Sequence, residues 1–260
     1  MSRATGLTWL LHLTGGEPTA YPGFADLAAA LSARHYLSMN SNLSLASVAA
    51  FAEAVDPARV SFINGGLHPA ERARKSGLEI FNANIVLLRE RGFPVFVSVV
   101  ATPEVLADVE AVTRSVAATG LVPVPKILRG AHHGKAYPRA YSGAERRSFE
   151  MMSRHARDVY ADWRIARPEC PTIDPFEDDR FLGGTPGYTG KSCEAGRRFA
   201  RLEPDGEAYR CGSREPLGNV LTGSFAPWSE ARRCDTHYCF YFCRKYTDRT
   251  AARLAQLSAP

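Results

Sequence analysis

The chain has 260 residues, of which 45% are apolar, so it is long and apolar enough to bury a core and is not expected to be disordered. Its formal net charge is +5, with Lys and Arg scattered among Asp and Glu, and we expect no nucleic-acid partner from such a distribution. No stretch reaches the ~18 apolar residues of a membrane span and the start lacks the pattern of a secretory signal, so we expect no membrane partner and a cytoplasmic protein.

The first 130 residues alternate between strand-like and helix-like segments. Strands are expected at 7–13, 35–39, 59–63, 94–100 and 121–128, and helices at 24–33, 45–55, 70–91 and 103–118. Phe24, Leu27 and Leu31 would share one face of the first helix. Crossovers of this length are too long for hairpins, so the pattern predicts an α/β fold with parallel strands and outer helices, as in a barrel or a doubly wound sheet.

The pattern changes after residue 129. Residues 130–141 read as a loop, and a capping box of Ser142 and Glu145 opens a helix that is expected to run to about residue 165. Residues 166–190 are rich in proline, glycine and acidic residues, which indicates a linker. A hairpin is expected over 199–211, with its turn at 204–206, and residues 246–260 form a charged, alanine-rich tail.

A diglycine motif follows the first strand, in the sequence Gly15-Gly16-Glu17-Pro18. Two glycines let the backbone approach a ligand closely, and an adjacent carboxylate can accept hydrogen bonds from an ammonium group. Ligands of α/β proteins bind at the carboxyl ends of the strands, which is where this motif lies. The alternative is a tight turn in which Glu17 only begins a helix.

The motif and its context resemble the radical S-adenosylmethionine enzymes, in which a Gly-Gly-Glu segment ends the second barrel strand. The segments 40–43, 61–66, 91–97 and 125–130 resemble the third to sixth strands of that family. The resemblance implies a partial (β/α)6 TIM-like barrel that lacks its first β-α unit. It also implies an S-adenosylmethionine site with the cofactor-binding residues Gly15, Gly16, Glu17, Pro18, Asn42 and Asn64.

Five cysteines crowd the last third of the chain, at Cys193, Cys211, Cys234, Cys239 and Cys243. The spacing from Cys193 through Gly206 to Cys211 resembles the Cys-x(9–15)-Gly-x4-Cys signature of SPASM and twitch modules. Thiolates are the usual ligands of iron–sulfur clusters, so these cysteines predict a metal site in a small Cys-rich β-hairpin module. A structural zinc site is the alternative, although the usual paired Cys-x2-Cys knuckles are missing.

The array departs from a complete SPASM module, which has seven cysteines and two clusters. One auxiliary [4Fe-4S] cluster is therefore expected. The resemblance assigns to it Cys193, Cys211 and Cys243, with Cys234 or Cys239 as the fourth ligand. The expected domains are a partial barrel over 1–165, a linker over 166–190, the auxiliary module over 191–245 and the tail.

Radical chemistry in this family needs a cluster held by Cys-x3-Cys-x2-Cys after the first barrel strand, but no cysteine precedes residue 170. One interpretation is that the given sequence lacks the start of a radical enzyme. The parent would form a 5′-deoxyadenosyl radical, receive electrons from a flavodoxin or ferredoxin and act on an unknown substrate of the peptide or protein class. The other interpretation is a non-catalytic binding or scaffold protein that keeps a structural iron–sulfur or zinc site.

Several polar residues near the last strand carry less information. His132 and His133 lie in the loop near the expected substrate position, where they either serve function or are simply solvated. Lys126 and Arg129 could hold a carboxylate or phosphate, or be ordinary surface charges. No catalytic residue is assigned from the sequence.

Overall fold

The computed structural model describes residues 5–161, 175–184, 187–237 and 239. These residues divide into two compact units. The sheet unit comprises 9–161 with 175–184, and the cysteine unit comprises 5–8 with 187–237 and 239. Each unit is described by itself below.

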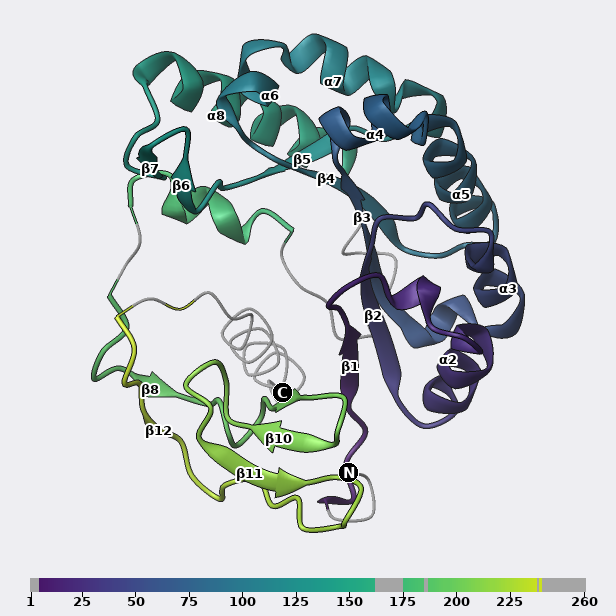
Figure 1. Ribbon diagram of the computed structural model, residues 1–260, viewed down its shortest axis with the longest axis vertical. Helices are drawn as coiled ribbons and strands as arrows, with labels where there is room; N and C mark the ends of the chain where they lie inside the picture. Colours follow the sequence, from purple (N-terminus) through teal and green to yellow (C-terminus); the bar gives the residue numbers. More distant parts are fainter. Residues whose placement is uncertain (1–4, 162–174, 185–186, 238, 240–260) are drawn as a thin grey trace, which may run out of the picture. The chain divides into compact units, whose positions relative to one another are not determined.

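The sheet unit is built on five parallel strands that follow one another in chain order (Figure 1). The strands are β1 (Leu10–Leu13), β2 (Tyr36–Ser41), β3 (Val60–Leu67), β4 (Val95–Val100) and β5 (Pro123–Lys126). Figure 1 shows the sheet curving, with the helices along its outer side. The predicted α/β architecture is confirmed, and it is consistent with a partial barrel.

Helices connect successive strands, as the alternating pattern predicts. They are α2 (Phe24–Ser32), α3 (Ser47–Ala54), α4 (Pro69–Lys75), α5 (Leu78–Glu90), α6 (Pro103–Ala107) and α7 (Val109–Ser115), with short 3-10 turns at Pro18–Ala20, Pro57–Arg59 and Ala117–Thr119. Two helices predicted as continuous are in fact broken. The first breaks at Ser76, which adopts a left-handed conformation with φ 49°. The second breaks at Asp108, whose carboxylate caps α7 by accepting from the Ala111 N–H.

The predicted apolar face of α2 is wrong in detail. Phe24, Ala28 and Ser32 are its buried residues, whereas the side chain of Leu27 is 42% exposed. Phe24 stacks on Phe51 of α3 with ring centroids 5.6 Å apart. This aromatic contact fixes which face of α2 points inward, because an aromatic pair buries more area than a single leucine.

The two faces of the sheet differ in chemistry. Side chains alternate along a strand, so the register places His12, Asn40, Asn64 and Phe96 on one face, which we call the inner face. The His12 ring lies 5.6 Å from the ring of Phe62, which is on the same face. The opposite face packs on the helices, since an added Cβ at Gly65 would meet the Leu43 and Phe81 side chains. The polar inner face distinguishes this sheet from one buried on both sides, whose strands are apolar throughout.

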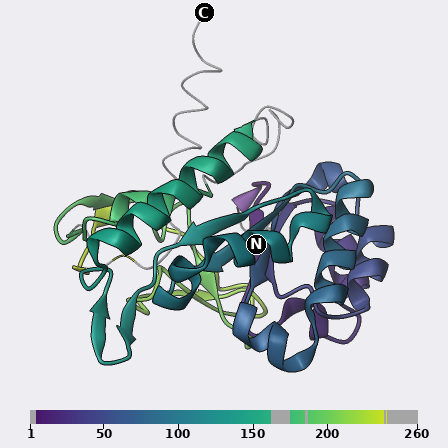
Figure 2. The same cartoon turned by 90° about the horizontal axis from the view of Figure 1, so that it is seen from above.

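The segment predicted as a loop after β5 contains a hairpin. Strands β6 (Gly130–His132) and β7 (Lys135–Tyr137) pair antiparallel, and Figure 2 shows them as a projecting ribbon. Helix α8 (Gly143–Val159) follows, and the predicted capping box of Ser142 and Glu145 is present. The 3-10 helix Glu177–Phe181, within the expected linker, belongs to the sheet unit.

The cysteine unit is made of short strands. Strands β9 (Arg201–Leu202), β10 (Glu207–Tyr209) and β11 (Pro216–Asn219) form an antiparallel sheet, and β8 (Ser192–Cys193) pairs with β12 (Arg232–Arg233). The predicted hairpin corresponds to β9 and β10. Gly206 in its turn has φ 85°, and an added Cβ would lie 2.6 Å from Leu221 Cγ, so the position requires glycine.

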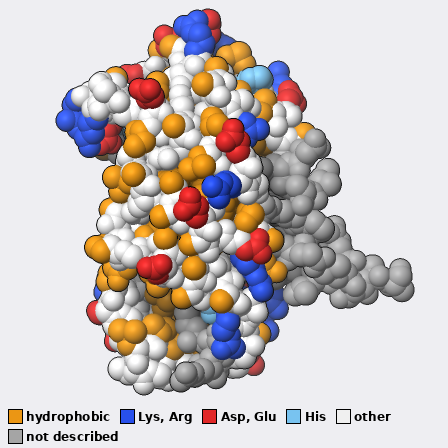
Figure 3. All heavy atoms as spheres, turned by 90° about the vertical axis from the view of Figure 1, so that its right-hand side faces the viewer, with side chains coloured by type: hydrophobic (Ala, Val, Ile, Leu, Met, Phe, Trp, Pro, Cys, Tyr) orange, Lys and Arg blue, Asp and Glu red, His pale blue; other side chains and the backbone are white. Residues whose placement is uncertain are grey.

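No helix in the described part of the chain is long and apolar enough to cross a membrane. On the molecular face drawn in Figure 3, acidic and basic side chains are interspersed among apolar ones. This distribution agrees with the scattered charges of the sequence. The predicted tail and Cys243 lie outside the described residues.

Candidate functional site

The diglycine turn after β1 is exposed and open. Gly15 and Gly16 have φ of 91° and 54°, which side chains rarely tolerate. An added Cβ at either position would meet no protein atom within 4 Å. The glycines are therefore required by the backbone conformation, and the turn leaves its peptide groups accessible to a ligand. Pro18 occupies the first turn of the short helix that follows.

The Glu17 carboxylate ties this turn to the end of β2. Its Oε1 accepts from the Thr19 N–H at 3.1 Å and from the hydroxyls of Thr19 and Ser41, both at 2.7 Å. Its Oε2 accepts from the Asn42 N–H at 2.7 Å. A carboxylate has about four acceptor positions, and three of these bonds converge on Oε1. Oε2 is therefore the oxygen that retains capacity for an ammonium group.

Asn42 contributes mainly through its backbone. Its Oδ1 accepts from the Ser44 N–H at 3.0 Å and from the Ser44 hydroxyl, which forms a local Asx turn. The carbonyl oxygen of the Asn42 side chain, expected to contact the cofactor, is thus occupied locally. The Asn42 main chain instead holds Glu17.

A pair of amides lies beside the turn on the inner face. Asn64 Nδ2 donates to Asn40 Oδ1 at 3.1 Å, and Asn40 Nδ2 lies 3.5 Å from the Thr14 hydroxyl. Asn64 lies within β3, which runs four residues farther than predicted. The Oδ1 of Asn64 is buried and has no hydrogen-bond partner among the described residues. Because an unsatisfied buried acceptor costs about 1–3 kcal/mol, this oxygen is suited to a ligand donor.

Arg72 clamps the ends of β2 and β3. Its Nη2 donates to the carbonyls of Asn42 and Gly66, the latter at 2.9 Å, and its guanidinium lies 3.7 Å from the Phe81 ring centroid. Burial lowers the pKa of Arg72 to about 10, a value at which the side chain still carries its charge at neutral pH. The sequence pattern does not single out this residue, because it is one of two arginines in α4.

Lys126 and Arg129, expected either to hold an anion or to be ordinary surface charges, bind groups within the protein. Arg129 Nη2 pairs with Asp178 at 3.0 Å, and Lys126 donates to the Pro175 carbonyl. Both cations therefore hold the segment 175–184 within the sheet unit. Tyr137 and Tyr141 are buried and pack edge to face with centroids 4.9 Å apart, which fixes the loop between β5 and α8.

The cysteine unit gathers four of the five expected thiols. Cys193, Cys211 and Cys239 pack in one apolar group with Ala195 and Phe199. Cys234 lies close enough to interact electrostatically with Cys193 and Cys239, and burial raises its pKa. None of these four cysteines forms a disulfide among the described residues. They come from three separate segments, brought together by the pairing of β8 with β12 and by the hairpin.

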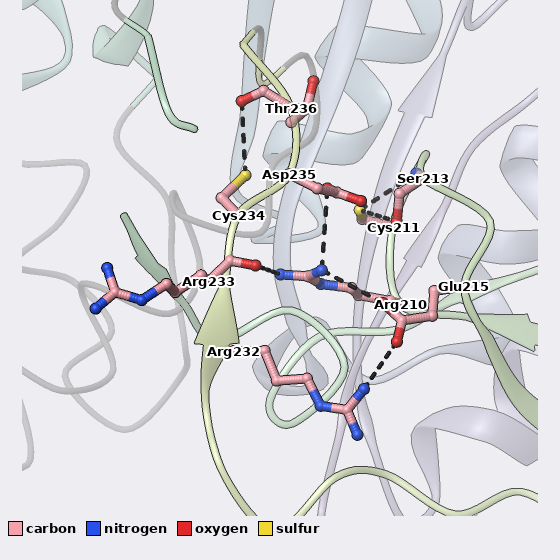
Figure 4. Close-up of polar contacts among 9 residues, drawn as sticks. All are labelled: Arg210, Cys211, Ser213, Glu215, Arg232, Arg233, Cys234, Asp235 and Thr236. Atoms are coloured by element: carbon pink, nitrogen blue, oxygen red, sulfur yellow. Dashed lines mark hydrogen bonds and ion pairs between the residues drawn. The ribbon is translucent and has the colours of Figure 1, made fainter. Parts of the chain in front are cut away.

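Arg210 lies beside these thiols with its side chain only 3% exposed (Figure 4). It donates to the Arg233 carbonyl at 2.8 Å and lies 3.4 Å from Glu215. Burial alone would lower its pKa, but Cys193, Cys211 and Asp235 raise it above the ordinary value. A buried cation at this place would offset the negative charge of thiolates, which are the state in which cysteine binds metals.

Zinc and an iron–sulfur cluster require different distances between the cysteine sulfur atoms. Among the described residues, no three cysteine sulfur atoms all lie within 4.8 Å of one another. Tetrahedral zinc with Zn–S bonds of ~2.3 Å holds sulfurs about 3.8 Å apart. An iron–sulfur cluster contains several atoms between its ligands, so its thiolates lie farther apart.

We compared the chain with known proteins, and only solved structures match it. No protein-family model and no curated protein matches the chain. A solved structure of histidine-tagged anSMEcpe with bound AdoMet matches with TM-score 0.52 and 15% identity, over 83% of this chain and 61% of that one. "Native anSMEcpe with bound AdoMet and Kp18Cys peptide" matches with TM-score 0.50 and 18% identity, over 83% and 65%.

The chain shares its fold with these AdoMet-bound structures, and this likeness agrees with the resemblance predicted from the sequence. At 15–18% identity the likeness extends no further than the fold. The chain spans 61–65% of the length of these structures.

Proposed function

We propose that the sheet unit binds S-adenosylmethionine at the carboxyl ends of β1 to β3, as part of a radical S-adenosylmethionine enzyme. The observation that carries this proposal is the open diglycine turn held against β2 by Glu17. Next to it lies the buried Oδ1 of Asn64, which has no hydrogen-bond partner in the part of the chain that the structure describes. The bound AdoMet named for the structures of similar fold supports the same ligand class.

Each residue has a separate part in this site. The exposed peptide groups of Gly15 and Gly16 would receive the amino and carboxyl groups of the methionine moiety. Glu17 Oε2 would accept from the ammonium group, since it has acceptor capacity and a negative charge. Asn64 Oδ1 would accept a hydroxyl or amine hydrogen from the nucleoside, and Pro18 would fix the start of the turn.

We propose that the cysteine unit holds one auxiliary [4Fe-4S] cluster. The proposed ligands are Cys193 and Cys211, with either Cys234 or Cys239, and Cys243, which lies outside the described residues. The grouping of the thiols and the adjacent Arg210 cation support the cluster, because a cation offsets the negative charge of thiolates. Zinc is the alternative that elemental analysis would reveal.

Bound S-adenosylmethionine supplies, after one-electron reduction, the ability to abstract a hydrogen atom from a substrate. Residues 1–169 contain no cysteine, so these residues are assigned cofactor binding and not its reduction. A flavodoxin or ferredoxin is the proposed electron source, and a peptide is the proposed substrate. The peptide named in one structure of similar fold supports that class. A non-catalytic binding protein is the competing function.

Calorimetric titration of the full chain with S-adenosylmethionine tests the proposed site. We expect saturable binding that Glu17→Gln weakens by roughly tenfold or more, since one hydrogen-bonded carboxylate contributes about 1.5–3 kcal/mol. Glu53→Gln is the matched control, because Glu53 is exposed and 3.9 Å from a single arginine. Absence of binding by the wild-type chain, or equal binding by both variants, would overturn the assignment.

Metal analysis tests the cluster separately. Anaerobic reconstitution should load iron and sulfide in near-equal amounts, and Cys211→Ala should abolish this loading. Zinc without iron in anaerobically purified protein would contradict the cluster while leaving the S-adenosylmethionine site untouched.

A further inference from the structure

A second group of ligand-bearing side chains lies in the sheet unit. It consists of Glu104 at the start of α6 and of His132 and His133 in the β6–β7 hairpin. One ligand atom from each lies within 4.8 Å of the others. His132 Nε2 is 3.3 Å from Glu104 Oε2, and His133 Nε2 is 3.2 Å from Glu104 Oε1.

These distances are also compatible with metal ligands. Charge-assisted N–H···O bonds are usually about 2.7–2.9 Å long, which is shorter than both contacts. Ligands about 2.0–2.1 Å from a tetrahedral metal are separated by roughly 3.3 Å. Each histidine nitrogen therefore already lies at about this distance from a Glu104 oxygen.

The hairpin turn is shaped to present both histidines. His132 pairs with Lys135, which leaves His133 and Gly134 as a two-residue loop with φ of 47° and 75°. Positive φ at both positions defines a type I′ turn, for which Asn-Gly is the preferred sequence. A left-handed histidine costs about 1 kcal/mol or more, so imidazole is used here where backbone preference alone would select another residue.

The surrounding residues hold the three ligands in place. The Tyr141 hydroxyl donates to the Ala101 carbonyl and accepts from the Leu128 N–H at 3.0 Å, which joins the loop that carries Glu104 to the loop that precedes the hairpin. The Tyr137 ring packs against His132.

We propose that Glu104, His132 and His133 form a binding site for a divalent transition-metal ion, of the zinc, cobalt or iron(II) class. Two imidazoles and one carboxylate are a ligand set that such ions take in proteins, and they leave positions open for water or a substrate group. The side chains of Glu104 and His133 are 59% and 75% exposed, so an ion can enter from solvent. The site lies at the carboxyl end of the sheet, beyond β4 and β5.

Cobalt(II) binding to the full chain tests this site and separates it from the cysteines. Ions bound by thiolates show intense sulfur-to-cobalt charge transfer, whereas the proposed ligands give only weaker d–d bands. We expect the wild-type chain to bind one more equivalent of Co²⁺ than Glu104→Gln, and that equivalent should lack charge transfer. His133→Asn, which tolerates positive φ, should weaken the same equivalent by roughly tenfold or more.

Histidine ring NMR signals supply a direct readout. Paramagnetic Co²⁺ should broaden the signals of His132 and His133 at one equivalent, while His155, which is exposed on α8, stays sharp. His155→Asn is the control variant and should leave Co²⁺ stoichiometry unchanged. Equal Co²⁺ binding by the wild type, Glu104→Gln and His133→Asn would overturn the site, as would broadening of all three histidines together.

Discussion

Arg72 illustrates how one buried side chain can organise a binding edge. It satisfies the carbonyls of Asn42, Gly66 and Gly77 at the ends of β2, β3 and α4. Arg72→Met should fill similar volume but leave these acceptors without their donor. We expect the free energy of unfolding, measured in urea, to fall by about 3 kcal/mol.

The same variant should weaken S-adenosylmethionine binding, because Asn42 holds Glu17 through its N–H. Arg74→Met, at an exposed position of the same helix, is the control and should change neither quantity. Unchanged stability in Arg72→Met would mean that the three carbonyls find water or other partners. Arg72 would then not hold the ends of β2, β3 and α4 together.

His12 predicts a pH dependence of stability. It lies on the inner face with Nδ1 2.9 Å from the Ser38 hydroxyl, and burial lowers its pKa from 6.5 to about 4. The unfolded chain therefore binds a proton at higher pH than the folded protein does. The contribution of His12 is complete above pH 6.5 and is lost as the pH falls toward 4, by about 2–3 kcal/mol.

Urea unfolding of the wild type and of His12→Asn at pH 7 and pH 4.5 measures this contribution. The wild type should lose more stability than the variant over this interval, by about 2 kcal/mol. His155→Asn, which alters an exposed histidine, should follow the wild type. Parallel losses in the wild type and His12→Asn would show that His12 does not remain neutral in the folded protein.

At the scale of elements, Tyr141 connects three of them through one hydroxyl. It joins the residue after β4 to the segment after β5, immediately before α8. Tyr141→Phe keeps the ring contact with Tyr137 but removes both bonds, so unfolding free energy should fall by about 2 kcal/mol in thermal or urea melts. Tyr137→Phe is the matched control because its ring is likewise buried, and an equal loss there would contradict the role of the hydroxyl.

The strand and helix order could be predicted because the periodicity changes between two and 3.6 residues along the chain. The helix breaks could not. At Ser76 the helix ends in a left-handed conformation, which a glycine at this position would have indicated in the sequence. Asp108 caps a new helix in the middle of an apparently continuous helical pattern. The predicted buried face of α2 was wrong because Leu27 and Ala28 both fit a helical periodicity. Only the contact between Phe24 and Phe51 selects which of them is buried.

The candidate site shows the same limit. Glu17 was predictable because Gly-Gly-Glu-Pro is a local motif, and its carboxylate also holds Ser41 and Asn42. The role of Arg72 in holding the strand ends depends on its contact with Asn42, 30 residues away, which no local pattern encodes. Lys126 and Arg129 looked available as anion ligands, but the segment 175–184 supplies partners for both. The two histidines were noted, whereas their convergence with Glu104 required the hairpin turn.

At the scale of the whole molecule, the two units differ in how much core they have. The sheet unit buries apolar residues from β2, β3, β4 and β5 and from the helices that cover them. The described residues of the cysteine unit include six buried apolar ones, namely Tyr188, Ala195, Ala208, Cys211, Leu217 and Phe225. A unit with so small a core depends on additional bonds such as metal ligation. The cluster proposed above should therefore stabilise the cysteine unit selectively.

Hydrogen exchange of the full chain, before and after Cys211→Ser, tests this selectivity. Amides of β10 and β11 should exchange roughly a hundredfold faster in the variant, since metal binding contributes folding free energy directly. Amides of β2, β3 and β4 should keep their protection and act as the internal control. Acceleration of equal size in both sets would show that the units unfold as one, and no acceleration in either would show that Cys211 ligation does not hold the cysteine unit together.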